Sequence, residues 1–523
     1  MEHLGKLVLT VKIYTMKNIK LSIIALAVTV LPVMSHAQSA AETELIKSKA
    51  LWFNSNNAAG LSVTPLSNYN EVSVNYLLEN GNFKMQQKGD KESNLRFNTN
   101  GAVKLGGVSL WGNFSYDNHT SKESRFNTNL FDPFRDMPYY IADTVSSKWK
   151  RQSYTLNVKA ASPILWNVVG AGIEADYISN TGAKQNDPRS TSYHYLISVR
   201  PGLIFKVSDR HYLGVNVVYE NGFERDVPTI SGQENQNVFV MRGLGNYTPG
   251  VVGGASMGYF YYKANKIGGA FQYGFTGRFS GLLDVKYHYK AEDVFQQPTK
   301  PQRMGSVAQN VIDGTLQLML NGEYTHKLTV GYLDKNTDGI EYIQDIQKDA
   351  EDQFWVTIAK FIKSNYRYKA ATLNYDIFKG RDNEYSWRAG VRGEYSDRFD
   401  EYYLPNSSLA AENIYGEIYF KKNFLLGARS KFLTGINLGY NKNLDGHYEY
   451  AGAESDSPVV AGLFYKDMKY LTSNYMRLGA ELNFSTLVSK KMAFFVKGEV
   501  QWLKATSYFD NRVYAAFSVG LLF

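Results

Sequence analysis

The sequence predicts an all-β protein, a transmembrane antiparallel outer-membrane β-barrel of about 18 strands (range 14–18) with a short N-terminal helix. The first observation is composition, because 39 Tyr, 29 Phe and 44 Gly beside only 13 Pro in 523 residues favour strands and tight turns. The second is a period-2 alternation of apolar with small or polar residues, in segments close to the roughly 9–11 tilted residues that cross a bilayer. The third is that short and long connections alternate, as in outer-membrane barrels.

The composition also excludes several classes of protein. The chain has no Cys, which removes disulfide scaffolds, thiolate nucleophiles, iron–sulfur clusters and zinc-thiolate sites. Without residues 1–37 the chain would carry 53 Lys and Arg against 48 Asp and Glu. This small excess is too dilute to predict binding to nucleic acid.

The first 37 residues are predicted to be a leader and a cleaved signal peptide. Lys17 and Lys20 precede an apolar run over residues 21–34, and Ala37 ends a small-x-small cleavage site. A membrane anchor is the alternative, but the run is shorter than the ~20 apolar residues of a spanning helix. Export predicts a location in the outer membrane of a Gram-negative bacterium, with outer-membrane lipid as a partner.

Residues 38–67 are predicted to be a periplasmic N-terminal segment with a helix. Helical spacing places Leu45 near Trp52, and Ile46 near Ala50 and Phe53. One interpretation is a helix that caps the barrel mouth. The other is a small plug inside the lumen that uses Leu45, Trp52 and Phe53, because a barrel of this size otherwise encloses open space.

Residues 68–523 are predicted to form the barrel. The last segment is the clearest, because apolar residues from Val513 to Phe523 occupy every second position. A strand that ends on Phe523 is typical of chains recognised by the barrel-insertion machinery, the second predicted partner. Eighteen segments alternate, near 69–79, 94–105, 108–118, 152–160, 168–179, 193–207, 211–221, 268–276, 279–290, 308–322, 326–334, 366–379, 385–396, 412–421, 431–441, 473–486, 491–503 and 513–523.

A soluble β-sandwich also alternates, so the ends of the segments matter. Tyr287, Tyr289, Trp387 and Tyr395 lie near segment ends, where a transmembrane barrel carries aromatic girdles. Long connections are expected at 118–151, 180–191, 224–266, 291–307, 334–365 and 445–470. The Gly- and aromatic-rich stretch 235–262 is expected to fold over or into the barrel mouth.

Charged residues on the polar face of the strands identify the expected lumen, because Arg or Lys facing lipid near the midplane costs about 2–4 kcal/mol. Both signs occur, which argues against a strongly ion-selective pore. The charges either pair with one another and fill the lumen or border a path for a polar solute. The candidate lumen-lining residues are Arg200, Asp284, Lys286, Arg388, Arg392, Glu394, Arg477, Glu481, Lys497 and Glu499.

No motif indicates catalysis, a metal or a cofactor. The sequence contains no His-x-x-x-His pair beyond residue 37, so a zinc hydrolase is not indicated. Its one Gly-x-Ser-x-Gly, at residues 254–258, falls in a Gly-rich stretch without the strand-turn-helix context of a serine hydrolase. An acidic group at Asp345, Asp349, Glu351 and Asp352 lacks the spacing of an EF-hand, and solvated surface charge is favoured over Ca²⁺ binding. We therefore predict a protein that is not an enzyme and has no cofactor.

The helix followed by Asn57-Ala58-Ala59-Gly60-Leu61 resembles the N-terminal element of FadL-type transporters and of PorV-like barrels of Bacteroidota. Ala58 stands where those families have Pro, and the similarity covers some 20 residues. Over its mature length the chain more closely resembles an uncharacterised family of Bacteroidota outer-membrane barrels. That resemblance implies fold and location, and it assigns no substrate and no site residues.

Two functions remain open. The first is a channel or transporter for a small solute, gated by the N-terminal segment and the long loops. The second is a non-catalytic outer-membrane component of a larger uptake or export and assembly complex, with a lipoprotein or transport-complex partner. A TonB-dependent receptor is not favoured, because about 30 residues between the predicted cleavage site and the first strand are too few for its plug domain.

Overall fold

The computed structural model describes residues 39–523 except 65, 233, 254–258, 298–299 and 349–352, so the predicted signal peptide lies outside the described residues. Strands dominate this part of the chain, with five short helical segments. None of the helices over these residues has the length and apolar character needed to cross a membrane. The helical segments are α2 (Ala40–Lys49), the 3₁₀ turns η1 (Leu51–Asn54) and η2 (Ala58–Ser62), η3 (Pro458–Phe464) and α3 (Tyr465–Leu471).

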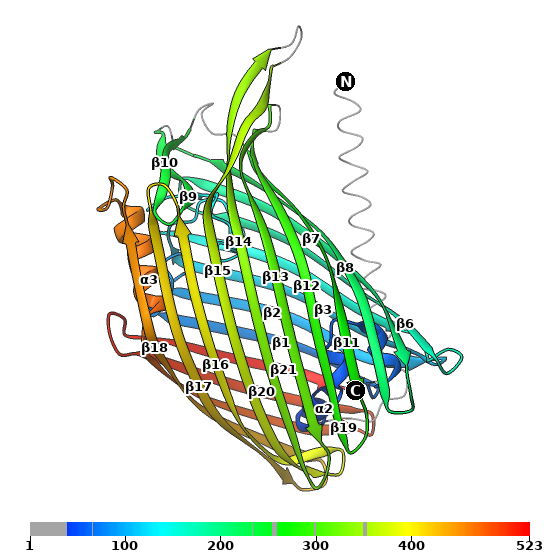
Figure 1. Ribbon diagram of the computed structural model, residues 1–523. Coiled ribbons are helices and arrows are strands. Elements are labelled where there is room, and N and C mark those ends of the chain that lie inside the picture. Colours follow the sequence, from blue (N-terminus) through cyan, green and yellow to red (C-terminus); the bar gives the residue numbers. More distant parts are fainter. Residues whose placement is uncertain (1–38, 65, 233, 254–258, 298–299, 349–352) are drawn as a thin grey trace, which may run out of the picture.

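Eighteen antiparallel strands form one sheet that closes on itself (Figure 1). The first strand pairs with the second and also with the last, for example Val74 with both Phe97 and Val519. The strands are β1 (Tyr69–Gly81), β2 (Lys91–Leu105), β3 (Val108–Ser124), β5 (Ser147–Ala161), β6 (Val169–Lys184), β7 (Arg189–Lys206), β8 (His211–Thr229), β11 (Phe260–Phe275), β12 (Phe279–Gln296), β13 (Gln302–Leu320), β14 (Tyr324–Lys348), β15 (Gln353–Arg381), β16 (Glu384–Tyr402), β17 (Ser407–Leu426), β18 (Ser430–Tyr450), β19 (Tyr475–Ser489), β20 (Met492–Ala505) and β21 (Asn511–Leu522).

The prediction of a closed antiparallel barrel of about 18 strands is confirmed. Each of the eighteen predicted segments coincides with one strand, and most strands extend further at the end that carries the long connections. The predicted loop 334–365 was wrong, because β14 and β15 continue as a paired hairpin through most of it. This hairpin rises above the rest of the barrel in Figure 1.

The two faces of the wall differ in chemistry. Exposed apolar side chains occupy alternate positions of each strand, such as Val285 and Tyr287 on β12 or Ile436 and Leu438 on β18. The intervening positions, such as Asp284 and Lys286, make polar contacts with neighbouring strands. Because side chains alternate between the faces of a strand, the apolar positions form the outer surface that faces lipid and the polar positions line the lumen.

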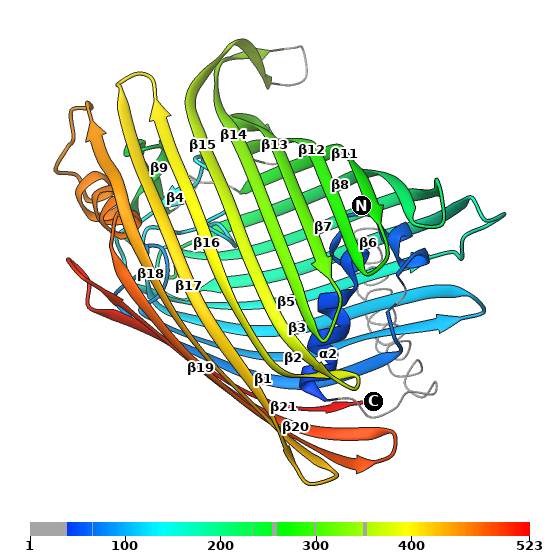
Figure 2. The same cartoon turned by 60° about the horizontal axis from the view of Figure 1, so that its bottom comes forward.

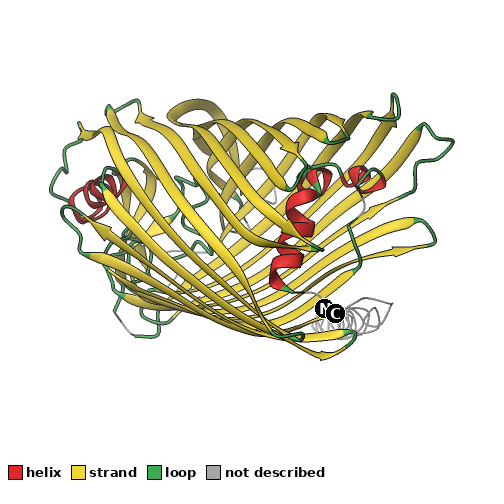
Figure 3. Ribbon diagram, turned by 90° about the horizontal axis from the view of Figure 1, so that it is seen from below, coloured by secondary structure: helices red, strands yellow, loops and turns green. Residues whose placement is uncertain are grey.

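The two mouths of the barrel are occupied by different segments. α2, η1 and η2 lie within the mouth at the end of the short turns (Figures 2 and 3). At the other mouth, a small sheet of β4 (Ile141–Ala142), β9 (Gln236–Gly243) and β10 (Asn246–Val252) packs with η3 in an apolar cluster. The expected aromatic loop 235–262 is thus mostly an ordered hairpin, whose residues 254–258 lie outside the described residues.

Candidate functional site

The N-terminal segment (residues 39–64) contacts the barrel wall on several sides. Its helix α2 begins at Ser39, which accepts a hydrogen bond from the Glu42 N–H and donates one to Glu384 of β16. Lys47 donates to Asn100 of β2, and Lys327 of β14 donates to the Ser48 carbonyl. Strands that lie far apart around the barrel can meet one short segment only across the lumen, so residues 39–64 occupy the lumen at this mouth.

Glu44 is the charged anchor of α2. The Tyr385 hydroxyl donates to Glu44 Oε2 at 2.7 Å, and Lys421 Nζ donates to Oε1 at 2.8 Å. Arg388 lies 3.9 Å away. Burial alone would raise the pKa of Glu44, but Lys421, Tyr385 and Arg388 outweigh burial and hold this pKa below its usual value. Glu44 is therefore ionised at neutral pH and ties the helix to β16 and β17.

Asn57 is the neutral anchor, and its side chain is completely buried. Its amide group donates to the carbonyls of Leu203 and Val215 and to Gln272 Oε1, at 2.9, 3.2 and 3.0 Å. Its carbonyl oxygen accepts from the Ala59 N–H and so caps η2. One side chain thereby joins the segment to β7, β8 and β11.

Glycines in the wall allow this close approach. A Cβ at Gly172 of β6 would lie 2.2 Å from the Ala59 nitrogen, and one at Gly202 of β7 would lie 2.2 Å from Asn57 Oδ1. A Cβ at Gly274 of β11 would lie 2.6 Å from the Trp52 ring. These glycines form a groove in the wall that fits the segment without space for side chains.

The three candidate plug residues all contact the wall from within the segment. Leu45 packs with Phe378, Tyr385 and Leu433, on β15, β16 and β18. Trp52 is buried with Ile204, Leu282 and Met319. The Phe53 ring meets Trp111 of β3 edge-on, with the ring centroids 5.3 Å apart.

All ten candidate lumen-lining residues lie at positions opposite in parity to the exposed apolar side chains of their strands. Six of them form one charged network over β16–β20. Arg392 contacts Glu417 at 2.8 Å and Arg477 lies 3.8 Å from the same carboxylate, while Arg388 contacts Asp376 at 3.0 Å. Lys497 reaches both Glu481 and Glu499, at 3.4 Å each.

Three others lie on the opposite part of the wall. Arg200 pairs with Glu174 and Asp176, Lys286 pairs with Asp313 at 2.9 Å, and Asp284 accepts from the Asn56 backbone and side chain. Arg200, Lys286 and Asn56 border a cavity of about 120 Å³. Glu394, the tenth residue, shares its face of β16 with Arg388 and Arg392, and no ion pair joins it to another described residue.

The larger of the two polar cavities lies against a different part of the wall. It has a volume of about 340 Å³ and is bordered by β1, β2, β20 and β21, including Glu71, Arg96, Lys497 and Glu499. Its lining is mostly polar and carries both signs of charge. This space is the part of the lumen best suited to a hydrated solute.

Sequence reasoning missed several residues that organise the site. Glu417 and Lys421 connect the predicted lumen charges, and Glu44 and Asn57 attach the N-terminal segment. The parity of β17 was a usable signal for Glu417 and Lys421, because both alternate with the apolar Ile418 and Phe420. No signal in the sequence shows which strands Asn57 meets.

Solved structures resemble the chain only distantly. The ferric preacinetobactin receptor BauA of Acinetobacter baumannii is 9% identical with a TM-score of 0.37, and the alignment covers 87% of this chain and 80% of BauA. The FrpB iron transporter of Neisseria meningitidis is 7% identical with a TM-score of 0.44, over 89% and 83% of the two chains. Pseudomonas aeruginosa OpdK with vanillate is 9% identical with a TM-score of 0.34, over 87% and 99%. The barrel assignment rests on the strand pairing itself.

No curated protein matches the sequence. One family model does match, over residues 58–523, which span η2 and every strand of the barrel. This match covers most of the chain, and it begins at the Ala58-Ala59-Gly60 turn that Asn57 caps. The chain therefore belongs to the family of unknown function DUF6850.

Proposed function

We propose that the chain is a channel or transporter for a small polar solute in the outer membrane of a Gram-negative bacterium, with residues 39–64 as its gate. The observation that carries the proposal is the polar lumen, where a mixed-charge cavity of about 340 Å³ lies beside a segment seated in one mouth. A barrel that served only as a membrane anchor would need neither an open polar space nor a fitted segment. A signal peptide in residues 1–37 would deliver the chain to this location.

Non-covalent contacts hold the gate, residues 39–64, against the barrel wall. Asn57 contributes neutral hydrogen bonds, Glu44 contributes ion pairs, and Leu45 and Trp52 contribute apolar burial. All of them join the segment to side chains or carbonyls of the wall, and none is a strand pairing. The segment can therefore leave without breaking the barrel sheet.

Single-channel conductance in planar bilayers tests the proposal. The signal-processed protein is compared with a variant lacking residues 38–53, and heat-dependent gel mobility checks that each barrel has folded. We expect brief or small conductance from the intact protein and larger, sustained conductance from the truncated one, since truncation removes α2 and η1 from the mouth.

A second function has its own supporting observation. The apolar cluster around Tyr139, Ile141 and Met241 closes much of the long-loop mouth, and the β14–β15 hairpin projects beyond it. Both features suit a barrel that serves as a component of a larger uptake or export complex. Absence of conductance from the intact and the truncated protein would reject the channel in favour of this role.

A further inference from the structure

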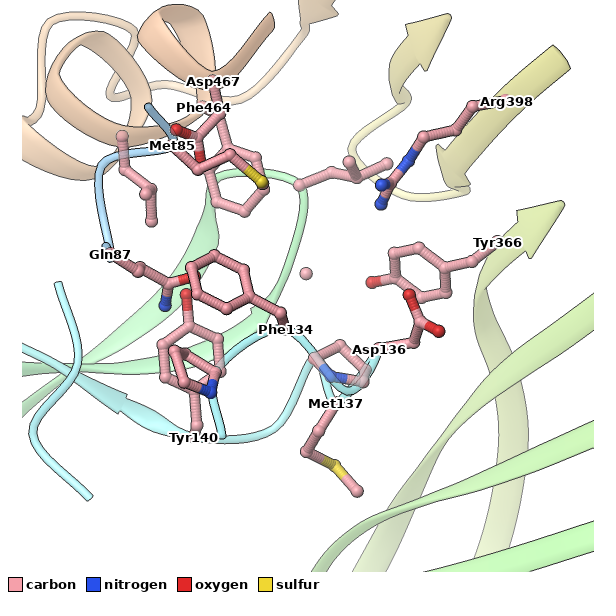
Figure 4. A pocket seen from close by; sticks show the side chains of 15 residues that line it. Met85, Gln87, Phe134, Asp136, Met137, Tyr140, Tyr366, Arg398, Phe464 and Asp467 are labelled. Atoms are coloured by element: carbon pink, nitrogen blue, oxygen red, sulfur yellow. The ribbon is translucent and has the colours of Figure 1, made fainter. Parts of the chain in front are cut away.

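A third cavity lies at the long-loop mouth (Figure 4). Its volume is about 160 Å³, and a cavity of about 150 Å³ is known to hold one benzene molecule. Five separate parts of the chain border it: the β1–β2 loop, residues 133–140, the β9–β10 turn, the η3–α3 helices and the facing strands β15 and β16.

Four aromatic rings form part of the wall of this mouth cavity. Phe134, Tyr140, Tyr366 and Phe464 all border it. Figure 4 places Tyr366 on one side of the space and Phe464, Phe134 and Tyr140 on the other. Aromatic rings around a small space attract organic cations, because the ring face carries partial negative charge.

The charges around the cavity leave one carboxyl group without a counter-ion. Arg398 donates from Nε to Asp400 at 2.6 Å, and Asp136 accepts from Lys335 at 2.5 Å, so these four charges cancel in pairs. Asp467 of α3 also borders the cavity and makes no ion pair with any described residue. When Asp467 is ionised, the local balance is therefore one negative charge.

Asp467 is only 6% exposed, and one of its oxygens accepts a hydrogen bond from the Gln86 N–H at 2.7 Å. Burial raises the pKa of Asp467 to about 7, although the Gln86 N–H, Lys84 and Arg398 oppose the rise. A buried carboxyl group with a raised pKa gains stability when a cation comes within contact distance. The Tyr366 hydroxyl is also buried, and it makes no hydrogen bond of ordinary geometry to any described residue.

We propose that the mouth cavity binds a small organic cation, an ammonium or quaternary ammonium group on a compact apolar body, between Asp467 and the aromatic rings. Asp467 supplies the counter-charge and Phe464 and Tyr366 supply ring faces. The unpartnered Tyr366 hydroxyl accepts or donates a hydrogen bond to a polar group of the ligand. This inference rests on the proposed function, since such a cation would be the solute captured at the outer mouth.

Calorimetric titration of the full signal-processed protein in a non-ionic maltoside detergent tests the inference. The probes are choline and its neutral isostere 3,3-dimethylbutan-1-ol, which have the same shape and differ in charge. The titrations are run at pH 8, above the pKa of about 7, so that Asp467 is mostly ionised. We expect choline to bind at least about tenfold more tightly than the alcohol.

Two variants and a matched control identify the site. Asp467→Asn keeps the shape of the side chain and is expected to reduce the preference for choline to less than about threefold. Phe464→Ala is expected to weaken choline binding by about three- to tenfold. Asp382→Asn removes a carboxyl group from an exposed turn at the opposite end of the barrel and should change nothing.

Equal binding of the two probes, no binding of choline, or an undiminished preference in Asp467→Asn would each overturn the inference. Conductance measured on the same preparations separates it from the proposed function. Conductance without choline binding rejects only the cation site. Choline binding without conductance in the intact or the truncated protein rejects the channel and leaves a receptor mouth.

Discussion

At the scale of single residues, Asn57 makes three hydrogen bonds to the wall, more than any other described side chain of residues 39–64. The substitution Asn57→Ala deletes three hydrogen bonds to the wall and the cap of η2. At about 1 kcal/mol each, we expect the binding of the N-terminal segment to the wall to weaken by about 4 kcal/mol. Limited proteolysis with mass spectrometry would show this as faster cleavage within residues 39–64. Asn54→Ala is the control, because Asn54 is exposed and makes one long bond of 3.4 Å to Lys47. Equal rates of cleavage in the two variants would contradict the role of Asn57 as an anchor of the N-terminal segment.

Asp467 gives the mouth cavity a predicted pH dependence. The groups that face it are Lys84 and the Gln86 N–H from the β1–β2 loop, Arg398 from β16 and Tyr140 from the 125–146 loop. Because its pKa is about 7, the carboxylate is present above that pH and is lost as the pH falls below it. Choline affinity should thus be constant above pH 8 and fall by up to about tenfold per unit below pH 6.

Titration of the same variants across pH 5 to 9 checks this prediction. The affinity of Asp467→Asn should be low and independent of pH over this interval, because an amide does not titrate. Glu44 differs, since its pKa lies below the usual value and it stays ionised throughout. If Asp467→Asn leaves the pH dependence of choline affinity unchanged, that dependence comes from the titration of another group.

At the scale of elements, the fit between the N-terminal segment and the wall depends on glycines in the strands. A Cβ at Gly172 would lie 2.2 and 2.6 Å from the backbone of Ala59, and backbone cannot turn aside as a side chain can. Gly172→Ala should therefore displace η2 and raise conductance and protease cleavage toward the level of the truncated protein. Gly498→Ala is the matched control in β20, because its Cβ meets nothing within 4 Å. Similar conductance in the two variants would show that the groove does not seat the segment.

Most elements were predictable, and the failures have physical reasons. The eighteen strands carry a period-2 pattern because one face meets lipid and the other meets water and the N-terminal segment. The pattern fails in the β14–β15 hairpin, which has register shifts at Gly339/Ile340 and Ile343/Gln344. Each shift exchanges the two faces of the strand, so the period-2 alternation is interrupted and the sequence of this paired region resembles that of a loop. The sheet of β4, β9 and β10 was missed because β4 has only two residues.

At the scale of the whole molecule, the candidate site was predictable only where it follows from strand parity. Arg388 and Glu481 could be assigned to the polar face because alternation places them there. The mouth cavity could not be predicted, because Asp467 and Tyr366 are about 100 residues apart and meet only after the barrel closes. The alternation in the sequence shows which face of its strand a residue occupies. The neighbours of that residue depend on which distant segments the closed barrel brings together.

The division of the whole wall into a lipid face and a lumen face gives the last prediction. Ile436 and Asn437 are adjacent on β18, but Ile436 is 64% exposed on the apolar face, and Asn437 donates to Glu417 on the polar face. Ile436→Lys should cost about 2–4 kcal/mol in lipid, since a charge meets hydrocarbon there. Asn437→Lys places the same charge beside a carboxylate and should cost less than about 1 kcal/mol. Urea titration of folding into lipid vesicles, followed by gel mobility, measures both. Equal destabilisation would mean that Ile436 does not face the bilayer, and the barrel would then not span the membrane in the orientation that its apolar face defines.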